Sequence, residues 1–251
     1  MITRLKDRDS LVLVGSVLGL GVLLWLMSAP LAMLPAPVGP AADQFSAGAL
    51  MTIQLTLVSG ISGLVLGVLA ALGKLSHLPP LRWLADFYVW VIRGTPLLLQ
   101  ILFVYFALPE ISPKLQLNEF WTAVIALSMN VGAYNAEAIR AGINAVPTGQ
   151  VEAARSLGLS KFYTFLDVTL PQAVRISLPP LASNLIALLK DSSLAYAIGV
   201  VELSMVSSRV QASSFQPFPV FITVAAVYLA LTTTFTQFAG ALERKLAVGK
   251  R

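Results

Sequence analysis

The sequence contains no cysteine and a single histidine, His77, among its 251 residues. A disulfide framework and a Cys-ligated metal site are therefore excluded, and neither a His-based zinc site nor a Ser/His/Asp triad is expected. The sequence also has no GxxxxGK[ST] phosphate-binding loop, so we expect the chain itself to bind no ATP in the usual manner. These absences leave no catalytic residue, metal ligand or bound cofactor to nominate, and they argue against an enzyme.

Charged residues are scarce as well, at 12% of the chain against about 25% in an average soluble domain. Hydrophobic residues make up 57%, and too few charges remain to cover the surface of a soluble fold of this size. Lipid must therefore be part of the solvent, which predicts an integral membrane protein. The formal net charge is +5, but the basic residues are scattered between apolar segments, so nucleic acid is not an expected partner.

Six apolar segments are long enough to cross a bilayer, which takes roughly 20 residues of helix. We therefore predict an all-α, polytopic membrane protein with six spans. The spans are expected at about 11–27, 47–72, 84–108, 120–139, 176–200 and 218–242. Between the first two lies a Pro/Gly-rich segment, 30–40, which we predict to be a linker that no helix crosses.

The orientation follows from the positions of the lysines and arginines, because cytoplasmic loops retain them. With the N-terminus inside, both ends of the chain are basic and cytoplasmic, including Lys250 and Arg251, and only Lys114 and Arg209 lie outside. We predict an N-in/C-in topology. The first span also resembles a signal peptide, and whether it is cleaved stays open.

One cytoplasmic loop, 141–175, is too polar to span a membrane and too patterned to be disordered. Pro147 is placed to start a short helix and Pro171 to end another. Apolar and charged residues alternate between them at helical spacing, as a docking surface requires. Gly158 permits a sharp change of chain direction.

Charged groups within a bilayer are costly and so are candidates for a functional role. Glu137 and Arg140 lie three residues apart on one helix face and are expected to pair. This pair is either a structural contact at the membrane edge or part of a gate for the solute.

Lys190 and Asp191 fall well inside the fifth predicted span and are followed by Ser192. Adjacent residues on a straight helix point about 100° apart. Either the helix is unwound there or each charged group meets a different neighbour. Unwound helices expose charges and backbone dipoles to solutes in transporters, so the three residues are candidates for substrate contact or gating; the alternative is structural pairing between helices.

In the third predicted span, the sequence Arg93-Gly94-Thr95-Pro96 interrupts the helical pattern. Pro96 lacks a backbone donor and Gly94 weakens the preceding turn, so we expect a kink. Arg93, Thr95 and Gln100 are further candidates for solute contact, although proline kinks also occur in membrane helices that bind no ligand.

The cytoplasmic loop carries a motif with fixed spacing. Glu152-Ala153-Ala154 is followed after three residues by Gly158, and after nine more by Val168-Thr169-Leu170-Pro171. This pattern resembles the EAA loop of ATP-binding cassette (ABC) importer permeases, with Val168 where isoleucine is usual.

Three further stretches resemble the polar amino-acid group of these permeases, which serves histidine, glutamine, arginine and opines. One is Arg93-Gly94-Thr95-Pro96-Leu97 with Gln100; the others are 135–140 and 189–194, the latter followed by Ile198-Gly199. The resemblance runs from about residue 47 to 245. It implies a five-span permease core within a domain at 46–251, with residues 1–45 forming an extra N-terminal span and its extracytoplasmic linker.

The resemblance also implies partners. These are two copies of an ABC ATPase that holds ATP and Mg²⁺, a second copy of the permease or a related permease, an extracytoplasmic solute-binding protein and membrane lipid, all at a bacterial cytoplasmic (inner) membrane. The ATPase would receive the coupling loop through six residues, Glu152, Ala153, Ala154, Gly158, Leu170 and Pro171.

Lys190 and Asp191 are the charges expected near the carboxylate and ammonium groups of a zwitterion. An importer permease for another small polar solute is the runner-up interpretation, and a secondary transporter without an ATPase is a third. The sequence does not name the amino acid or say whether the permease forms a homodimer.

Overall fold

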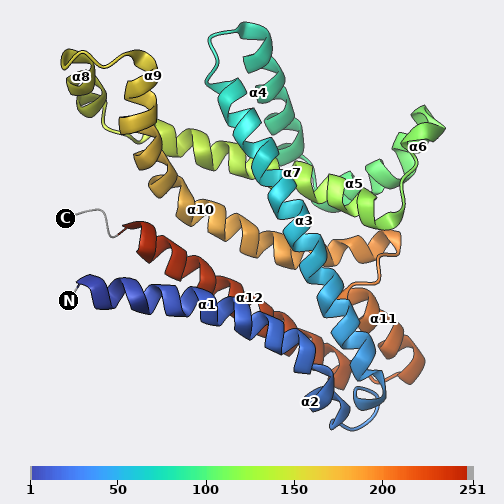
Figure 1. Ribbon diagram of the computed structural model, residues 1–251. Helices are drawn as coiled ribbons and strands as arrows, with labels where there is room; N and C mark the ends of the chain where they lie inside the picture. The colour runs from blue at the N-terminus through green and yellow to red at the C-terminus, as the bar shows by residue number, and fades with distance from the viewer. Residues whose placement is uncertain (1, 248–251) are drawn as a thin grey trace.

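The computed structural model describes residues 2–247, and this part of the chain consists of helices and short connections (Figure 1). Residues 248–251, with Lys250 and Arg251, lie outside the described residues. The longer helices are α1 (Ile2–Leu26), α3 (Ala42–Lys74), α4 (Pro79–Gly94), α7 (Glu119–Asn144), α10 (Leu170–Asp191), α11 (Leu203–Ser214) and α12 (Pro217–Ala247). The shorter ones are α2 (Ser28–Ala32), α5 (Leu97–Leu102), α6 (Leu108–Ile111), α8 (Thr148–Ser156) and α9 (Lys161–Tyr163), with π-helical turns at η2 (Phe103–Ala107) and η4 (Thr164–Thr169) and 3-10 turns at η1 (Gly39–Ala41), η3 (Pro113–Leu115) and η5 (Ser192–Ile198).

Two helices of the described chain are long and apolar enough to cross a membrane alone, Gly39–Lys74 and Pro217–Lys245. The number rises to four if each of two bent helix pairs counts as one span. The fourth predicted span corresponds to α7, which does not pass this test. Its apolar sequence is interrupted by Ser128, Asn130, Tyr134 and Asn135.

The segment predicted to be a linker that no helix crosses, 30–40, has a short helical turn at each end. Pro30 lies within α2, and Pro40 within η1. Proline is compatible with the first turn of a helix because the backbone N–H groups there have no acceptor inside the helix. The two short turns therefore occupy only the ends of the segment, and no helix crosses it.

Small residues set the crossing of α3 and α7, the most extensive helix contact in the fold. A Cβ atom on Gly67 would lie 2.6 Å from Asn135 Cβ, and one on Gly132 would lie 3.0 Å from Leu66 Cβ. Gly63, four residues before Gly67, also has no room for a side chain because Val131 occupies the space. Close backbone approach at glycines is typical of helix packing in membranes. It fixes the position of α7, which carries much of the site described below.

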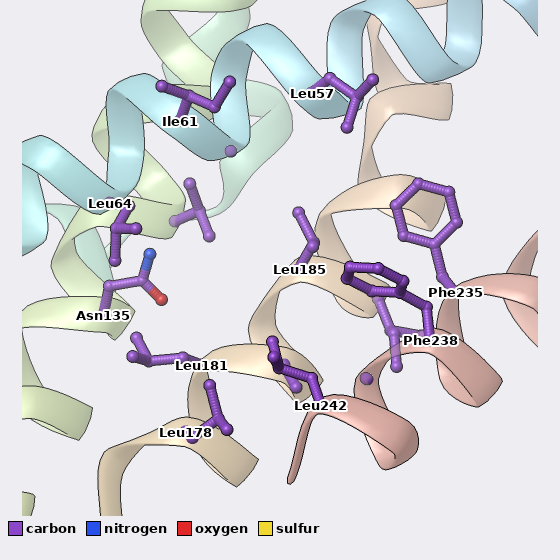
Figure 2. Close-up of a pocket in the computed structure, with 15 residues that line it drawn as sticks. Leu57, Ile61, Leu64, Asn135, Leu178, Leu181, Leu185, Phe235, Phe238 and Leu242 are labelled. Carbon is purple, nitrogen blue, oxygen red and sulfur yellow. The ribbon is translucent and has the colours of Figure 1, made fainter. Parts of the chain in front are cut away.

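The remaining helices are arranged around this crossing. The Tyr88 hydroxyl donates a 2.6 Å hydrogen bond to the Met129 carbonyl and ties α4 to α7. Helix α10 packs on α7 and α12, and α1 lies along α12 (Figure 1). The start of α1, the end of α12 and the α8–α9 loop lie toward one side of the fold, whereas α2, α6 and α11 lie toward the other. An apolar cavity lies between α3, α7, α10 and α12 (Figure 2).

Candidate functional site

A polar cavity of about 410 Å³ lies where α5, α7 and α10 meet. Its walls carry one carboxylate (Asp191), two amides (Asn130 and Asn184), the Thr95 hydroxyl and the Tyr134 phenol. The apolar lining residues are Pro96, Leu97, Val131, Ala187, Leu188 and Leu194. Because Asp191 is the only lining residue with an ionisable acid or base near neutral pH, the cavity favours a ligand with a positive group.

The break between α4 and α5 forms one wall of this cavity. Pro96 has no N–H and disfavours a helical conformation at the residue before it, and Thr95 and Pro96 are both extended, with ψ of 148° and 136°. The expected interruption of the third span is confirmed, but the two halves are bent by 110°, so the segment predicted at 84–108 is not one continuous helix.

Gln100 spans this break. Its Nε2 donates to the Ile92 carbonyl at 2.7 Å and to the Thr95 carbonyl at 3.1 Å, and its Oε1 accepts from Asn130 Nδ2 at 3.1 Å. Carbonyls that lose their helical partner at an interrupted helix need other donors, and the Gln100 amide supplies one. Gln100 does not line the cavity; it holds Thr95 and Asn130, which do.

Asp191 and Lys190 are adjacent in sequence, but their side chains have different surroundings. Both are the last residues of α10, which stays regular through them and tightens into η5 only from Ser192 onward. The sequence left open whether the helix unwinds at Lys190 and Asp191, and in the structure it stays helical through both. Asp191 lines the cavity, whereas Lys190 is exposed and does not line it.

Two other predicted residues lie at or behind the cavity wall. Ser192 is fully buried and donates a 2.8 Å hydrogen bond to the Leu189 carbonyl, so its hydroxyl is used within its own helix. Arg93 lies over the ring of Tyr134, with its guanidinium carbon 5.1 Å from the ring centroid. This cation–π contact places a positive group next to a residue of the cavity lining.

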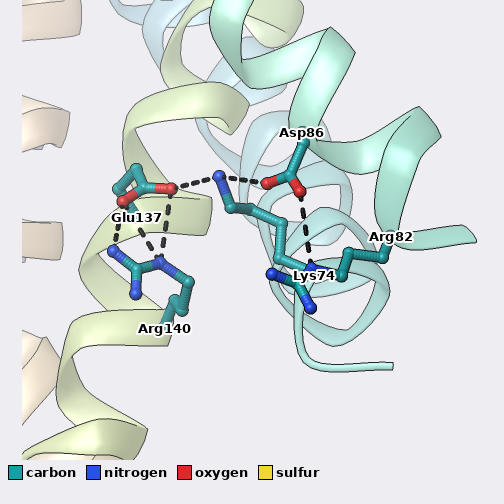
Figure 3. A network of polar contacts seen from close by, with 5 residues as sticks. All are labelled: Lys74, Arg82, Asp86, Glu137 and Arg140. Atoms are coloured by element: carbon teal, nitrogen blue, oxygen red, sulfur yellow. Dashed lines mark hydrogen bonds and ion pairs between the residues drawn. The ribbon is translucent and has the colours of Figure 1, made fainter. Parts of the chain in front are cut away.

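Glu137 lies in a different place, in an ionic network where α3, α4 and α7 meet (Figure 3). Its carboxylate contacts Arg140 Nη2 at 2.8 Å, which confirms the expected pair, and Lys74 Nζ at 2.8 Å. Lys74 Nζ also contacts Asp86 at 2.9 Å, and Arg82 approaches the same carboxylate at 3.8 Å. Glu137 is not among the residues lining the polar cavity.

We predict that Glu137→Gln lowers thermal stability and leaves the KM for solute unchanged. The side chains of Glu137 and Lys74 are only 21% and 15% exposed, so losing the carboxylate should cost about 1–3 kcal/mol, between the values for surface and buried pairs. At about 2–4 °C per kcal/mol, the melting temperature in detergent should fall by several degrees. Arg82→Gln, which removes an exposed contact, should change it by about 1 °C or less. Unchanged stability with weakened uptake would instead place Glu137 in the solute path.

The coupling loop forms the short helix and turn that were predicted. Helix α8 starts directly after Pro147, and Gly158 has a φ of +89°. The Leu159 N–H donates to the Ala154 carbonyl at 3.2 Å and the Gly158 N–H to the Arg155 carbonyl at 3.0 Å. This is the Schellman pattern, which places glycine in the left-handed conformation just after a helix.

The surface of this loop has an exposed apolar part. Ala154 is buried against the fold, whereas Leu157 is 86% exposed, and Phe162 and Tyr163 of α9 are exposed as well. Exposed apolar groups on a structured loop indicate a docking surface. In the matched motif, Glu152 and Ala153 lie in α8, and Leu170 and Pro171 lie in the first turn of α10. Pro171 therefore starts a helix, and the prediction that it ends one was wrong; its missing N–H costs nothing in a first turn.

Several residues of the site were not predicted. Asn130, Tyr134 and Asn184 were missed, although polar residues in an apolar helix were a usable signal. Glu202 is fully buried and caps α11, accepting from the Ser204 and Met205 N–H groups at 2.8 Å each. The Tyr228 hydroxyl donates to the same carboxylate at 3.0 Å. Glutamate is not a usual helix cap, so this role could not be predicted from the sequence.

Residues 63–248 match the family described as "Binding-protein-dependent transport system inner membrane component". The arginine transport system permease protein ArtQ of Bacillus subtilis is 40% identical over 199 residues, covering 79% of this chain and 90% of that protein. The L-cystine transport system permease protein TcyB of the same organism is 41% identical over 202 residues, 80% of this chain and 86% of that protein. A putative glutamine transport system permease protein GlnP of Rickettsia bellii is 39% identical over 201 residues, covering 80% of this chain and 92% of that protein.

Solved structures agree. A crystal structure described as an amino acid ABC transporter with histidines matches with a TM-score of 0.77 and 38% identity, covering 82% of this chain and 95% of that one. The MetNI methionine ABC transporter in an inward-facing conformation matches with a TM-score of 0.71, covering 82% of this chain and 98% of that one. Because the identity is only 20%, this match supports the fold alone. The chain belongs to the binding-protein-dependent transport system inner membrane components, the permease subunits of ABC transporters, and is a multi-pass transport subunit rather than an enzyme.

Proposed function

We propose that this chain forms the translocation path of an ATP-driven importer for polar amino acids. The observation that carries the proposal is the polar cavity with Asp191 in its wall, on a helix that begins in the coupling loop. The names of the relatives, which specify arginine, cystine and glutamine, support the substrate class.

The cavity provides groups for both ends of a zwitterion. The Asp191 carboxylate would accept hydrogen bonds from the ammonium group or from a cationic side chain, assisted by the Asn130 and Asn184 amides. Arg93, held over Tyr134 at the edge of the cavity, is the nearest candidate for the solute carboxylate. The Thr95 hydroxyl, which donates to the Val91 carbonyl at 2.9 Å and accepts from Gln100 Nε2 at 2.9 Å, would contribute only a further acceptor. We assign Gln100 and Ser192 a positioning role and give Lys190 no contact with this cavity.

Coupling would run along α10. This helix has 22 residues and so spans about 33 Å from the end of the coupling loop to Asp191. The Gln172 Nε2 donates to Gln150 Oε1 at 2.6 Å and joins α10 to α8. A partner ATPase that holds ATP and Mg²⁺ would bind α8 through Leu157 and its neighbours, and its closure would tilt α10 and expose the cavity to alternate sides of the membrane.

The assembly we propose has two permease chains, two ATPases and an extracytoplasmic solute-binding protein in a bacterial inner membrane. The chain would cross the membrane six times with both ends inside, counting α1, α7 and the two bent pairs as spans beside α3 and α12. The polar face of α7 is compatible with a span because its amides line the cavity or bond to α10, as Asn135 does to Asn184 at 3.0 Å. Residues 1–45, of which α1 lies along α12, are an addition to the five-span core.

Mild-detergent purification of the tagged chain from native membranes tests this proposal. Mass spectrometry of the partners should identify an ABC ATPase and a solute-binding protein, and the ligand extracted from the latter should be a polar amino acid. A binding protein loaded with a sugar or a peptide would overturn the substrate class. A complex with no ATPase would overturn the proposed coupling and favour a secondary transporter.

A further inference from the structure

The apolar cavity between α3, α7, α10 and α12 has no part in the proposed solute path. It has a volume of about 280 Å³ and shares only Val131 with the polar cavity. On α10 the apolar cavity is lined by Leu178, Leu181, Ala182, Leu185 and Ile186, none of which lines the polar cavity. The two cavities therefore lie on different faces of α10.

The walls of this cavity select an apolar occupant. Figure 2 shows Phe235 and Phe238 of α12 facing leucines of α10, with Leu57, Ile61 and Leu64 of α3 across the opening. Asn135 is the one polar side chain among the lining residues, and its Oδ1 already accepts the 3.0 Å bond from Asn184. The volume is below the roughly 300–1,000 Å³ of ordinary ligand sites, so a slender chain fits better than a bulky molecule.

Two basic residues continue the lining faces toward the end of the fold that holds the coupling loop. Arg175 precedes Leu178 by three residues and Ala182 by seven, and Lys245 follows Leu242 by three and Phe238 by seven. These spacings place each basic residue on the helix face that lines the cavity, one turn beyond it. Both are exposed, and neither has a hydrogen bond or ion pair with another described residue.

The acidic residue in this part of α12 lies elsewhere. Glu243 is two positions before Lys245, about 200° around the helix, so it is not on the lining face. The arrangement is thus an apolar slot with two positive charges at one end. In the proposed topology this end faces the cytoplasmic leaflet, where anionic lipids meet basic residues between membrane helices.

We propose that this cavity is a binding site for an anionic phospholipid of the cytoplasmic leaflet. One acyl chain lies between α3, α10 and α12, and the phosphate is held by Arg175 and Lys245. The lipid would thereby contact α10 next to the coupling loop. This lipid site depends on the proposed orientation of the chain in the membrane and not on the identity of the transported solute.

Native mass spectrometry of the full chain with its co-purified partners tests the site without any transport assay. Phosphatidylglycerol and phosphatidylcholine with identical acyl chains are titrated onto the delipidated complex. We expect phosphatidylglycerol to bind more tightly, and Arg175→Gln/Lys245→Gln to weaken it by roughly 25-fold, about fivefold for each basic residue. Arg155→Gln/Lys161→Gln removes two charges of the coupling loop that do not flank the cavity and should leave this binding unchanged. Equal binding of the two lipids, or an effect of the control equal to that of the test variant, would overturn the proposal.

A second variant tests the cavity itself and keeps both charges. Ala239→Phe places a ring in the space for the acyl chain and should weaken the binding of phosphatidylglycerol at least fivefold. Unchanged binding would show that the lipid lies elsewhere. Because the natural chain has no cysteine, Ala239→Cys also gives a clean cross-linking probe. A disulfide-linked permease dimer through this position would show a second copy of the chain in the cavity and would contradict the lipid assignment.

Discussion

Replacing Asp191 by asparagine is expected to raise the KM for a zwitterionic or cationic amino acid by roughly 10- to 150-fold. Asp191 is the only carboxylate in the wall of the polar cavity, and the substitution keeps its size while removing its charge. A hydrogen bond to a charged group contributes about 1.5–3 kcal/mol, which corresponds to this range of affinity. The measurement is the concentration dependence of uptake into proteoliposomes that contain the complete importer.

Lys190→Gln is the matched control, because Lys190 is the neighbour of Asp191 on the same helix but does not line the cavity. We expect its KM to stay within about threefold of the natural protein. Equal effects of the two variants would mean that both charges act on the solute and that Lys190 also belongs to the solute site. A normal KM for Asp191→Asn in an intact complex would remove Asp191 from solute binding.

Replacing Gly158 by valine is expected to uncouple the permease from its ATPase. The φ of +89° at Gly158 strains any β-branched residue, at a cost of about 1–3 kcal/mol. The turn would open, and α8 and α9 would meet the ATPase at a different angle. ATPase stimulation by the loaded binding protein should fall roughly tenfold or more, whereas membrane insertion should be normal.

Gly158→Asn separates the effect of backbone conformation from the effect of side-chain bulk. A Cβ atom at this position meets nothing within 4 Å, so neither substitution clashes with a neighbour. Asparagine adopts the left-handed conformation far more readily than valine, and it should retain most of the coupling. Full coupling in Gly158→Val, or equal loss in both variants, would contradict the role assigned to the turn.

The sequence was most informative where a local rule determines structure. Pro96 removes a donor and Gly94 weakens the preceding turn, so a kink in the third span could be predicted from two residues. Gly158 and the EAA spacing likewise predicted a turn that the structure contains. The same kind of rule failed for Pro171, because a proline that ends one helix and a proline that starts the next look alike in sequence.

Which residues form the site depends on contacts between residues that are far apart in the sequence. Local sequence patterns do not predict such contacts. Gln100 meets Asn130 across 30 positions, and Asn184 meets Asn135 across 49. Glu137 looked like a membrane charge with a helical partner, and its second partner, Lys74, lies on another helix. The separation of Lys190 from Asp191 depended on whether α10 stays regular, and the sequence left both outcomes open.

Reconstitution of the permease, its ATPase and the loaded binding protein in proteoliposomes is the decisive test of ATP-driven amino-acid import. We expect uptake of a labelled polar amino acid that requires ATP on the side of the coupling loop and is strongly weakened by Asp191→Asn. Uptake that proceeds without ATP, driven by an ion gradient alone, would contradict it.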